Sequence, residues 1–413
     1  MKINQEIVST VFKRLAITLG ILLFIRLGTF LPVPGINHSD LALYIQSHSV
    51  TRNLVSTFAG NDTFVIGLFT LNIFPYINAS ILVQLILGFS PQLSKMQKEG
   101  DLEGRRSINR LTRFITLIWA IIQSVSLAIY LTQILFDWNY TLALEIVVWL
   151  TTGSMIILWL SELITDYGLG NGASLLIYTN IISSLPNLTK VVLTNFTLVS
   201  GIGVILILFV TLYGIVFLQE GLRIVPLISS KQLNQSSIQE AGTSDYYIPL
   251  RLNQAGVMPI ILTTAILVVP NYVMNIGLFP KIDLPINLES LSIFYWVGYF
   301  LFILLFSLFY STIVLNPKDM SDQLQKMSVA IPGIRPGIQT TFYLKQVMKR
   351  TTLIGATMLA TVATIPNVLE STLSITNLNG LSSTSLLILA GVVLDLVREV
   401  KNIYFSNVYN NMY

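Results

Sequence analysis

Ten stretches of this chain are each apolar over about the 20 residues that an α-helix needs to cross a lipid bilayer. The chain is 53% hydrophobic and only 11% charged, whereas a soluble domain carries about a quarter charged residues. No single core buries that much apolar surface, so the sequence predicts an all-α polytopic membrane protein with ten transmembrane helices. The predicted spans lie near 12–31, 66–89, 114–136, 142–163, 173–192, 197–218, 255–276, 291–315, 351–370 and 382–398.

The basic residues test the number of spans and orient them. With the N-terminus on the cytoplasmic side, four loops and the C-terminal tail fall on that side too. Of the 24 Lys and Arg residues, all but four then lie there, which is a strong positive-inside pattern. Removing any one span would scramble this pattern, so we expect ten spans with both chain ends cytoplasmic. The cytoplasmic loops are 90–113, 164–172, 219–254 and 316–350, and the four exceptions are Arg26, Arg52, Lys190 and Lys281.

Ten spans divide into two halves of five, at 1–190 and 191–413. An odd number of spans per half forces the halves into opposite orientations, as in an inverted repeat. No convincing sequence identity relates the halves, so this prediction rests on the number of spans. No cleavable presequence precedes the first span, which we expect to be retained.

The reactive residues exclude several classes of function. The chain has no Cys, and its two His residues, His38 and His48, share one polar loop, which is typical of solvated side chains rather than of a metal site. Acidic residues crowd the ends of spans, whereas an ion-coupled transporter binds its ion near the midplane. We expect Glu162 and Asp395 to face headgroups or to pair with nearby basic residues. No catalytic motif is present, so we expect no enzyme activity, no cofactor and no metal.

The second span begins unusually, with the sequence NIFPYINASILVQ at 72–84. Pro75 has no N–H group and favours the first turn of a helix, so a helix can restart near it. Asn72 and Asn78 can satisfy the backbone groups freed at the break, because lipid offers no water to do so. A proline kink within one continuous span is the alternative.

A series of motifs follows along the chain. They are RLGTFLPVPG, FPYINASILVQLI, KEGDLEGRRSINRLTR, LWLSELITDYGLGNGAS, LNQAGVMP, NPKDMSDQLQKMSVAIPGIRPGIQT and TSLLILAGVVLD. In this order, and over nearly the whole chain, they resemble the SecY family, the channel subunit of the protein translocon. The stretch 315–398 is most similar to the cyanobacterial and plastid branch.

The resemblance implies that two five-helix halves surround an hourglass pore that opens sideways between the second and seventh spans. It also implies a constriction of isoleucines, one position of which is the smaller Ala173. A ring of branched apolar side chains dewets a narrow neck and bars ions, yet yields to a polypeptide. By motif matching, the ring residues are Ile73, Ile77, Ile177, Ile261 and Ile388.

Two further features follow from the resemblance. A short helix at about 54–66 corresponds to the plug under the pore, with Ala59, Gly60, Asn61, Asp62 and Thr63 at its centre. Gln84 and Asn253 lie on the helices that flank the lateral gate, where polar contacts hold the gate shut and a signal sequence replaces them. Ordinary interhelical bonding without gating is the alternative for these two residues.

The resemblance also predicts a docking face and partners. Arg335 in the IRPG loop matches the arginine that the family uses for motor-dependent translocation, and Arg105 and Arg106 add positive charge on the same side. The resemblance is weakest in loop 219–254, which is nearly neutral and lacks the family's paired arginines. Expected partners are a SecE-like small subunit, a SecA-type ATPase motor, client signal sequences, a SecG-like third subunit and, with weaker support, the ribosome.

The sequence is therefore interpreted as the central channel subunit of a Sec translocon, which conducts unfolded proteins across the membrane and releases apolar segments into lipid. A solute transporter and a non-conducting docking scaffold or insertase are the alternatives. The branch resemblance, the short tail and the lack of a transit peptide favour the plastid thylakoid membrane, with a bacterial plasma membrane as the alternative.

Overall fold

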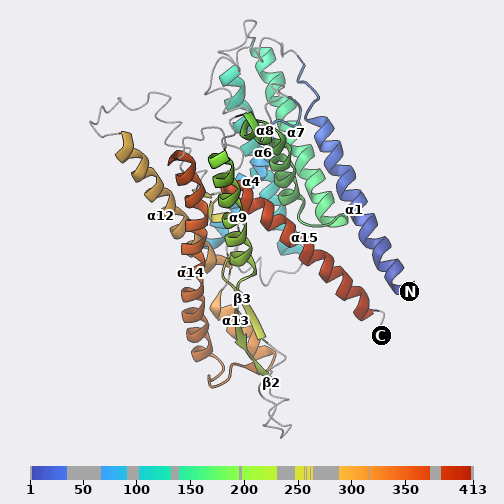
Figure 1. The fold of residues 1–413 in the computed structure, drawn as a ribbon. Coiled ribbons are helices and arrows are strands. Elements are labelled where there is room, and N and C mark those ends of the chain that lie inside the picture. The colour runs from blue at the N-terminus through green and yellow to red at the C-terminus, as the bar shows by residue number, and fades with distance from the viewer. Residues whose placement is uncertain are drawn as a thin grey trace. The chain divides into compact units, whose positions relative to one another are not determined.

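A computed structural model gives the fold of the chain (Figure 1). It describes residues 2–34, 67–90, 102–131, 139–194, 198–229, 247–254, 256, 258–260, 262–263, 288–314, 316–372 and 383–410. The described helices are α1 (Lys2–Gly28), α4 (Phe74–Phe89), α6 (Leu102–Leu131), α7 (Tyr140–Tyr167), α8 (Gly172–Thr194), α9 (Leu198–Glu220), α12 (Leu288–Val314), α13 (Pro317–Lys326), α14 (Ile338–Thr372) and α15 (Ser383–Asn410). The strands are β1 (Leu222–Pro226), β2 (Ile228–Ser229), β3 (Tyr247–Arg251) and β4 (Val329–Ala330).

Nine of the predicted spans overlap helices, and most of the remaining one, 255–276, lies outside the described residues. Among the described residues, the helices Arg106–Ile129 and Tyr140–Tyr167 are long and apolar enough to cross a membrane. Shorter apolar helices occur at Phe74–Leu87, Gly172–Ser183, Phe209–Glu220 and Trp296–Ser311. The helical fold agrees with the sequence, and the number of spans stays a prediction.

The chain divides into two compact units. The first unit comprises 1–190 and 392–413, and the second comprises 191–391. Helix α15 therefore begins in the second unit and ends in the first. The predicted inverted relation of two five-helix halves stays a prediction.

In the first unit, α6 packs against both α4 and α7, and α1 packs against α7. The side chains of α7 that are buried recur three or four residues apart, which is the spacing of one helix face. The outer faces are apolar as well: Phe12 and Leu23 of α1 and Phe114 of α6 are all more than half exposed. Helices with apolar side chains on both the inner and the outer face are typical of proteins that span a membrane.

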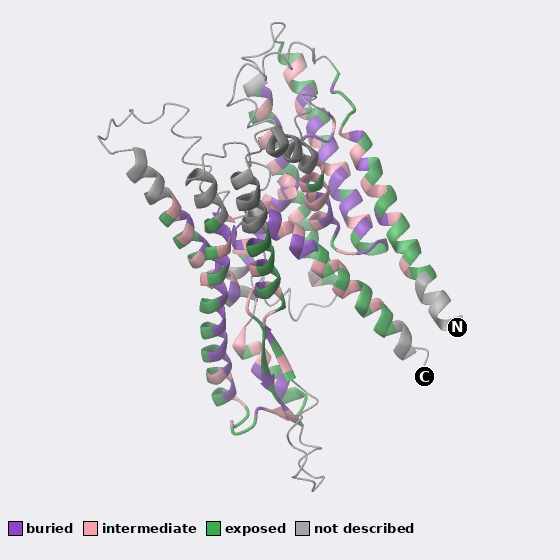
Figure 2. Cartoon of the chain, in the orientation of Figure 1, coloured by how far each residue is buried: buried purple, intermediate pink, exposed green. Residues whose placement is uncertain are grey.

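In the second unit, α14 packs against α9, α12 and α13. Figure 2 shows buried residues along one side of α14 and exposed residues along the other. One core cluster lies where α9, α12, α14 and α15 meet, and Tyr299, Ile303 and Leu359 are almost fully buried there.

A second core cluster in this unit joins the two long loops that the sequence treated separately. Strand β1 pairs with β3 within the first loop, and β2 of the first loop pairs with β4 of the second. Leu250 from the first loop and Leu344 from the second are buried in one cluster. We call residues 221–229, 247–252 and 316–350 the loop module, because they fold around this shared core beside one end of α14 (Figure 1).

Candidate functional site

The start of α4 carries the residues that the sequence places at the pore. Asn72 has a φ of 49°, in the left-handed region, and its side-chain Oδ1 accepts a hydrogen bond from the Ile73 N–H at 2.8 Å. Pro75 lies in the first turn of α4. The helix therefore begins at Phe74, next to Pro75, as expected, and Asn72 satisfies a backbone donor at the break. The same role for Asn78 stays a prediction.

The residues before α4 form a turn at 67–73, here called the buried turn, whose residues are all buried except the half-buried Leu68. Its backbone groups find partners, as they must where no water reaches. The Leu68 N–H donates to Leu31 O at 2.9 Å, and Thr70 Oγ1 accepts from the Gly67 N–H at 2.8 Å. A Cβ atom at Gly153 of α7 would overlap the Leu68 carbonyl oxygen, so α7 approaches the buried turn at its backbone.

The predicted ring residues differ in burial. Ile73 is 1% exposed and Ile77 is 7% exposed, and they lie one helical turn apart, with the Ile77 N–H donating to Ile73 O at 3.1 Å. Ile177 of α8, in the same unit, is half-buried, as is Ile388 of α15 in the second unit. Ile261 lies outside the described residues. The ring stays a prediction.

The plug, including Ala59, Gly60, Asn61, Asp62 and Thr63, lies outside the described residues. The two gate residues are both half-buried. Gln84 lies on α4 as expected, whereas Asn253 lies in a non-helical stretch just after β3 and not on a helix. Asn253 Nδ2 donates to Gly256 O at 3.1 Å, a local bond that holds the turn leading into the seventh span. Their gating role stays a prediction.

Arg335 is exposed in the loop between β4 and α14. Thr340 Oγ1 donates to the Arg335 carbonyl oxygen at 2.9 Å, and Ser321 Oγ of α13 donates to the Gly337 carbonyl oxygen at 3.0 Å. The backbone of the loop is thus held while the guanidinium group faces solvent. Arg106 is exposed near the start of α6, and the side chain of Arg105 lies outside the described residues.

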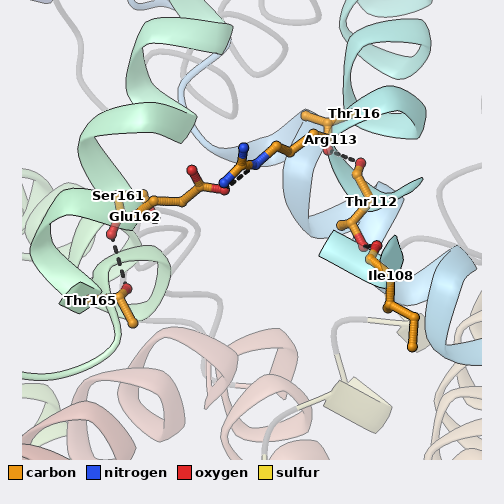
Figure 3. A network of polar contacts seen from close by, with 7 residues as sticks. All are labelled: Ile108, Thr112, Arg113, Thr116, Ser161, Glu162 and Thr165. Carbon is orange, nitrogen blue, oxygen red and sulfur yellow. Dashed lines mark hydrogen bonds and ion pairs between the residues drawn. The ribbon is translucent and has the colours of Figure 1, made fainter. Parts of the chain in front are cut away.

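Two acidic residues pair as the sequence predicted. Glu162 Oε1 of α7 accepts from Arg113 Nε of α6 at 2.8 Å, as Figure 3 shows, and this ion pair links the two helices near one end. Asp395 Oδ1 lies 3.2 Å from Arg398 Nη1, one turn along α15. Glu162 and Arg113 are partly exposed, so their pair contributes about 1 kcal/mol at most.

Sequence reasoning missed three polar contacts that join distant segments. Thr18 Oγ1 of α1 accepts from the Leu169 N–H at 2.9 Å, which fastens the turn between α7 and α8 to α1. In the second unit, Ser311 Oγ of α12 donates to Gln254 Oε1 at 2.8 Å and lies 2.8 Å from Thr352 Oγ1 of α14. For the contacts of Gln254, the available indication in the sequence was that this residue follows Asn253 within the LNQAGVMP motif.

Comparisons with known sequences agree on one family. The family model described as SecY matches residues 67–397. The chain is 62% identical over 416 residues to the protein translocase subunit SecY of Trieres chinensis, covering 98% of each chain. It is 42% identical to the SecY of Porphyra purpurea, covering 97% of each. It is 38% identical to the SecY of Synechococcus elongatus, covering 97% of this chain and 93% of the relative.

Solved structures share the fold. One is a SecY protein whose plug domain is described as stabilising the closed state of the translocation channel, with a TM-score of 0.68 and 16% identity over 97% of this chain and 94% of that one. Another is Sec61 in the canine ribosome–channel complex from the endoplasmic reticulum, with a TM-score of 0.62 and 18% identity over 97% and 94%. The chain therefore has the fold of these channel proteins.

Proposed function

The chain belongs to the SecY family, and from this premise we propose that it is the central channel subunit of a Sec translocon. It conducts unfolded proteins across a membrane and releases apolar segments sideways into lipid. The observation that carries the proposal is the 62% identity to a protein translocase subunit SecY over 98% of both chains. The physical requirement is a passage that binds no client tightly, which suits a chain whose spans are apolar and whose acidic residues crowd the span ends.

The proposed neck of the pore consists of Ile73, Ile77, Ile177, Ile261 and Ile388. The burial of Ile73 and Ile77 one turn apart at the start of α4 supports this assignment for two members. Branched apolar side chains exclude water from a narrow passage, so ions meet a high barrier while an extended polypeptide displaces the side chains.

The proposed plug is the segment 54–66, with Ala59, Gly60, Asn61, Asp62 and Thr63 at its centre. The described role of the plug in a SecY relative of the same fold supports it. Asp62 is costly to bury in lipid but tolerable in a water-filled funnel, so the plug closes the pore from the side of the membrane opposite the two chain ends.

The proposed lateral gate is held by Gln84 and Asn253. Polar contacts between transmembrane helices contribute about 0.6 kcal/mol on average, which is small enough for a client's apolar signal helix to replace. A ligand that binds the open gate better than the closed one shifts the gate towards opening.

The proposed docking face is formed by Arg335 in the loop module, with Arg105 and Arg106 at the start of α6. The exposure of Arg335 and Arg106 supports it. The proposed partners are a SecA-type ATPase, because the chain has no P-loop of its own, together with a SecE-like and a SecG-like small subunit. Ribosome binding has weaker support, since it is described for a distant relative of the same fold.

The proposed location is the plastid thylakoid membrane, and the proposed architecture is ten spans in two inverted halves around an hourglass pore. The similarity to the SecY proteins of Porphyra purpurea and Synechococcus elongatus supports the location, together with the resemblance of 315–398 to the cyanobacterial and plastid branch. The chain carries no catalytic activity in this proposal, and the energy for translocation comes from the motor.

The test is purification of the tagged chain in mild detergent, followed by reconstitution into lipid vesicles. A SecE-like protein should copurify, and the vesicles should import a signal-bearing protein only when a SecA-type motor and ATP are added. A control client that lacks its signal sequence should stay outside. Saturable uptake of a small solute, or an intact complex that imports no protein, would contradict the proposal.

A further inference from the structure

The buried turn contains an unusual backbone conformation. Among the described residues, Asn72 and Ser328 are the non-glycine residues with a positive φ. Ser328 is exposed in the loop module, whereas Asn72 is only 4% exposed and directly precedes Ile73. Side chains other than glycine disfavour this region, although asparagine tolerates it better than most. A buried left-handed residue therefore indicates a position where the fold requires that turn of the chain.

Asn72 is the joint between a fixed turn and a helix. On one side, Leu68 ties the buried turn to Leu31, just after α1, and the turn contacts α7 at Gly153. On the other side, α4 begins immediately, with Ile73 as its N-cap residue. The Asn72 N–H donates to Phe69 O at 3.0 Å, so the left-handed residue closes the turn before the chain enters the helix.

The dihedral angles at Asn72 therefore set where α4 starts and in which direction it points. Ile73 follows directly, and Ile77 is fixed relative to Ile73 by the first helical hydrogen bond. The Asn72 side chain adds a bond to the Ile73 N–H, one of the donors that a helix N-terminus leaves without an intrahelical partner.

We propose that Asn72 is a positioning residue for the closed neck: its left-handed backbone holds Ile73 and Ile77 at the level where they seal the pore. This inference rests on the proposed function, because it assumes that these isoleucines line the neck. It goes beyond the ring itself, because it assigns the seal to a residue that does not line the pore.

The test measures ion conductance of the purified, partner-bound complex in planar bilayers, without a client. Asn72→Gly should stay close to the parent, because glycine adopts the left-handed region freely. Asn72→Ala should raise the closed-state leak about tenfold, because the left-handed region disfavours an alanine by roughly that factor. Asn72→Val should leak more, since a branched residue there is a genuine outlier. Ser328→Ala, at the other left-handed non-glycine residue among those described, lies exposed in the loop module; it is the matched control and should not leak.

Ile77→Ser tests the neck assignment independently of Asn72, because a hydrated neck should leak whatever holds it in place. If Ile77→Ser does not leak, the neck assignment is wrong, and the positioning role of Asn72 is overturned as well. If Ile77→Ser leaks but Asn72→Ala stays tight, the neck stands and the positioning role is overturned. An equal leak from Asn72→Gly and Asn72→Ala also overturns it, since the backbone would then not matter. Should Asn72→Val fail to assemble, the small Ala and Gly variants still decide the outcome.

Discussion

At the scale of single residues, Arg335 shows how a rigid backbone presents one charge. Its carbonyl oxygen is bonded to Thr340, and its side chain is exposed. We predict that Arg335→Glu lowers motor-driven protein import about a hundredfold, because placing like charges against each other at an interface costs several kcal/mol. Membrane insertion and partner assembly should not change. The measurement is import into reconstituted vesicles alongside copurification of the SecE-like subunit.

Lys326→Glu is the charge-matched control, since Lys326 is exposed on α13 of the same loop module. It should reduce import much less than Arg335→Glu. Equal losses would mean that the net charge of the module matters and not the position of Arg335. Loss of the protein from the membrane would make Arg335 a structural residue.

The sequence predicted the partners of polar contacts at short range but not those at long range. Glu162 was expected to face headgroups or to pair with a basic residue, but its partner Arg113, 49 positions away, was not identified. Asn72 bonds its own neighbour, and Asp395 pairs three residues along its helix, so local spacing was sufficient. Thr18 bonds a residue 151 positions away, and Gln254 bonds partners 57 and 98 positions away. One chain without known packing carries no signal for such pairs, because a threonine or glutamine in a span has many possible partners.

At the scale of elements, hydropathy located helices but not where they end. The predicted span 351–370 lies inside α14, which starts at Ile338. The additional turns are amphipathic and bury Leu344, Val347 and Met348 in the loop module. A hydropathy window along the sequence detects helical turns that face lipid and misses turns that are half polar. The sequence did not predict the pairing of β2 with β4 either, because each strand has only two residues.

The shared core of the loop module leads to a prediction about the nearly neutral loop 219–254. Leu250 is 2% exposed, so Leu250→Ala should destabilise the module by about 2–5 kcal/mol. Motor-driven import should fall as well, although the variant changes no charge, because the module holds the Arg335 loop. Amide hydrogen exchange in β3, α13 and the first turns of α14 measures the loss of stability directly.

Leu222→Ala is the matched control for this prediction. Leu222 lies in the same two-stranded sheet but is 49% exposed, so its truncation should cost about 0.5 kcal/mol or less. Unchanged hydrogen exchange in Leu250→Ala would show that the two loops are stable independently. Normal import despite faster exchange would show that docking does not need an ordered module.

The plug also belongs to the element scale. We predict that deleting 58–64 yields a channel that opens briefly and repeatedly without a client. The closed pore then has only the isoleucine neck as a barrier, because the plug is gone. The recording is made in planar bilayers, with the deletion and the parent complex side by side. Replacing the same residues by a Gly/Ser segment of equal length separates the loss of the plug from strain in a shortened loop. A deletion variant as ion-tight as the parent would reduce 54–66 to a surface loop.

At the scale of the whole molecule, charge asymmetry predicts the topology. Loops 90–113 and 316–350 should be accessible from the same side of the membrane as both chain ends, because nearly all basic residues then share that side. Since the chain has no Cys, single cysteines in these loops report their side through a membrane-impermeant thiol reagent. A cysteine at Arg52 should be labelled only from the opposite side. Labelling of the two loops from opposite sides would refute ten spans.

Helix α14 finally has a mechanical consequence. Its first 28 residues, 338–365, precede Pro366 and make a rod of about 42 Å that belongs to two cores. Leu344 near one end is buried in the loop module, and Leu359, Ala360 and Ala363 further along are buried among α9, α12 and α15. A long helix bends only gently, so the rod acts as a lever arm. Under the proposed function, we expect a motor that pushes on the Arg335 loop to apply torque, through this helix, to its packing against α9, α12 and α15.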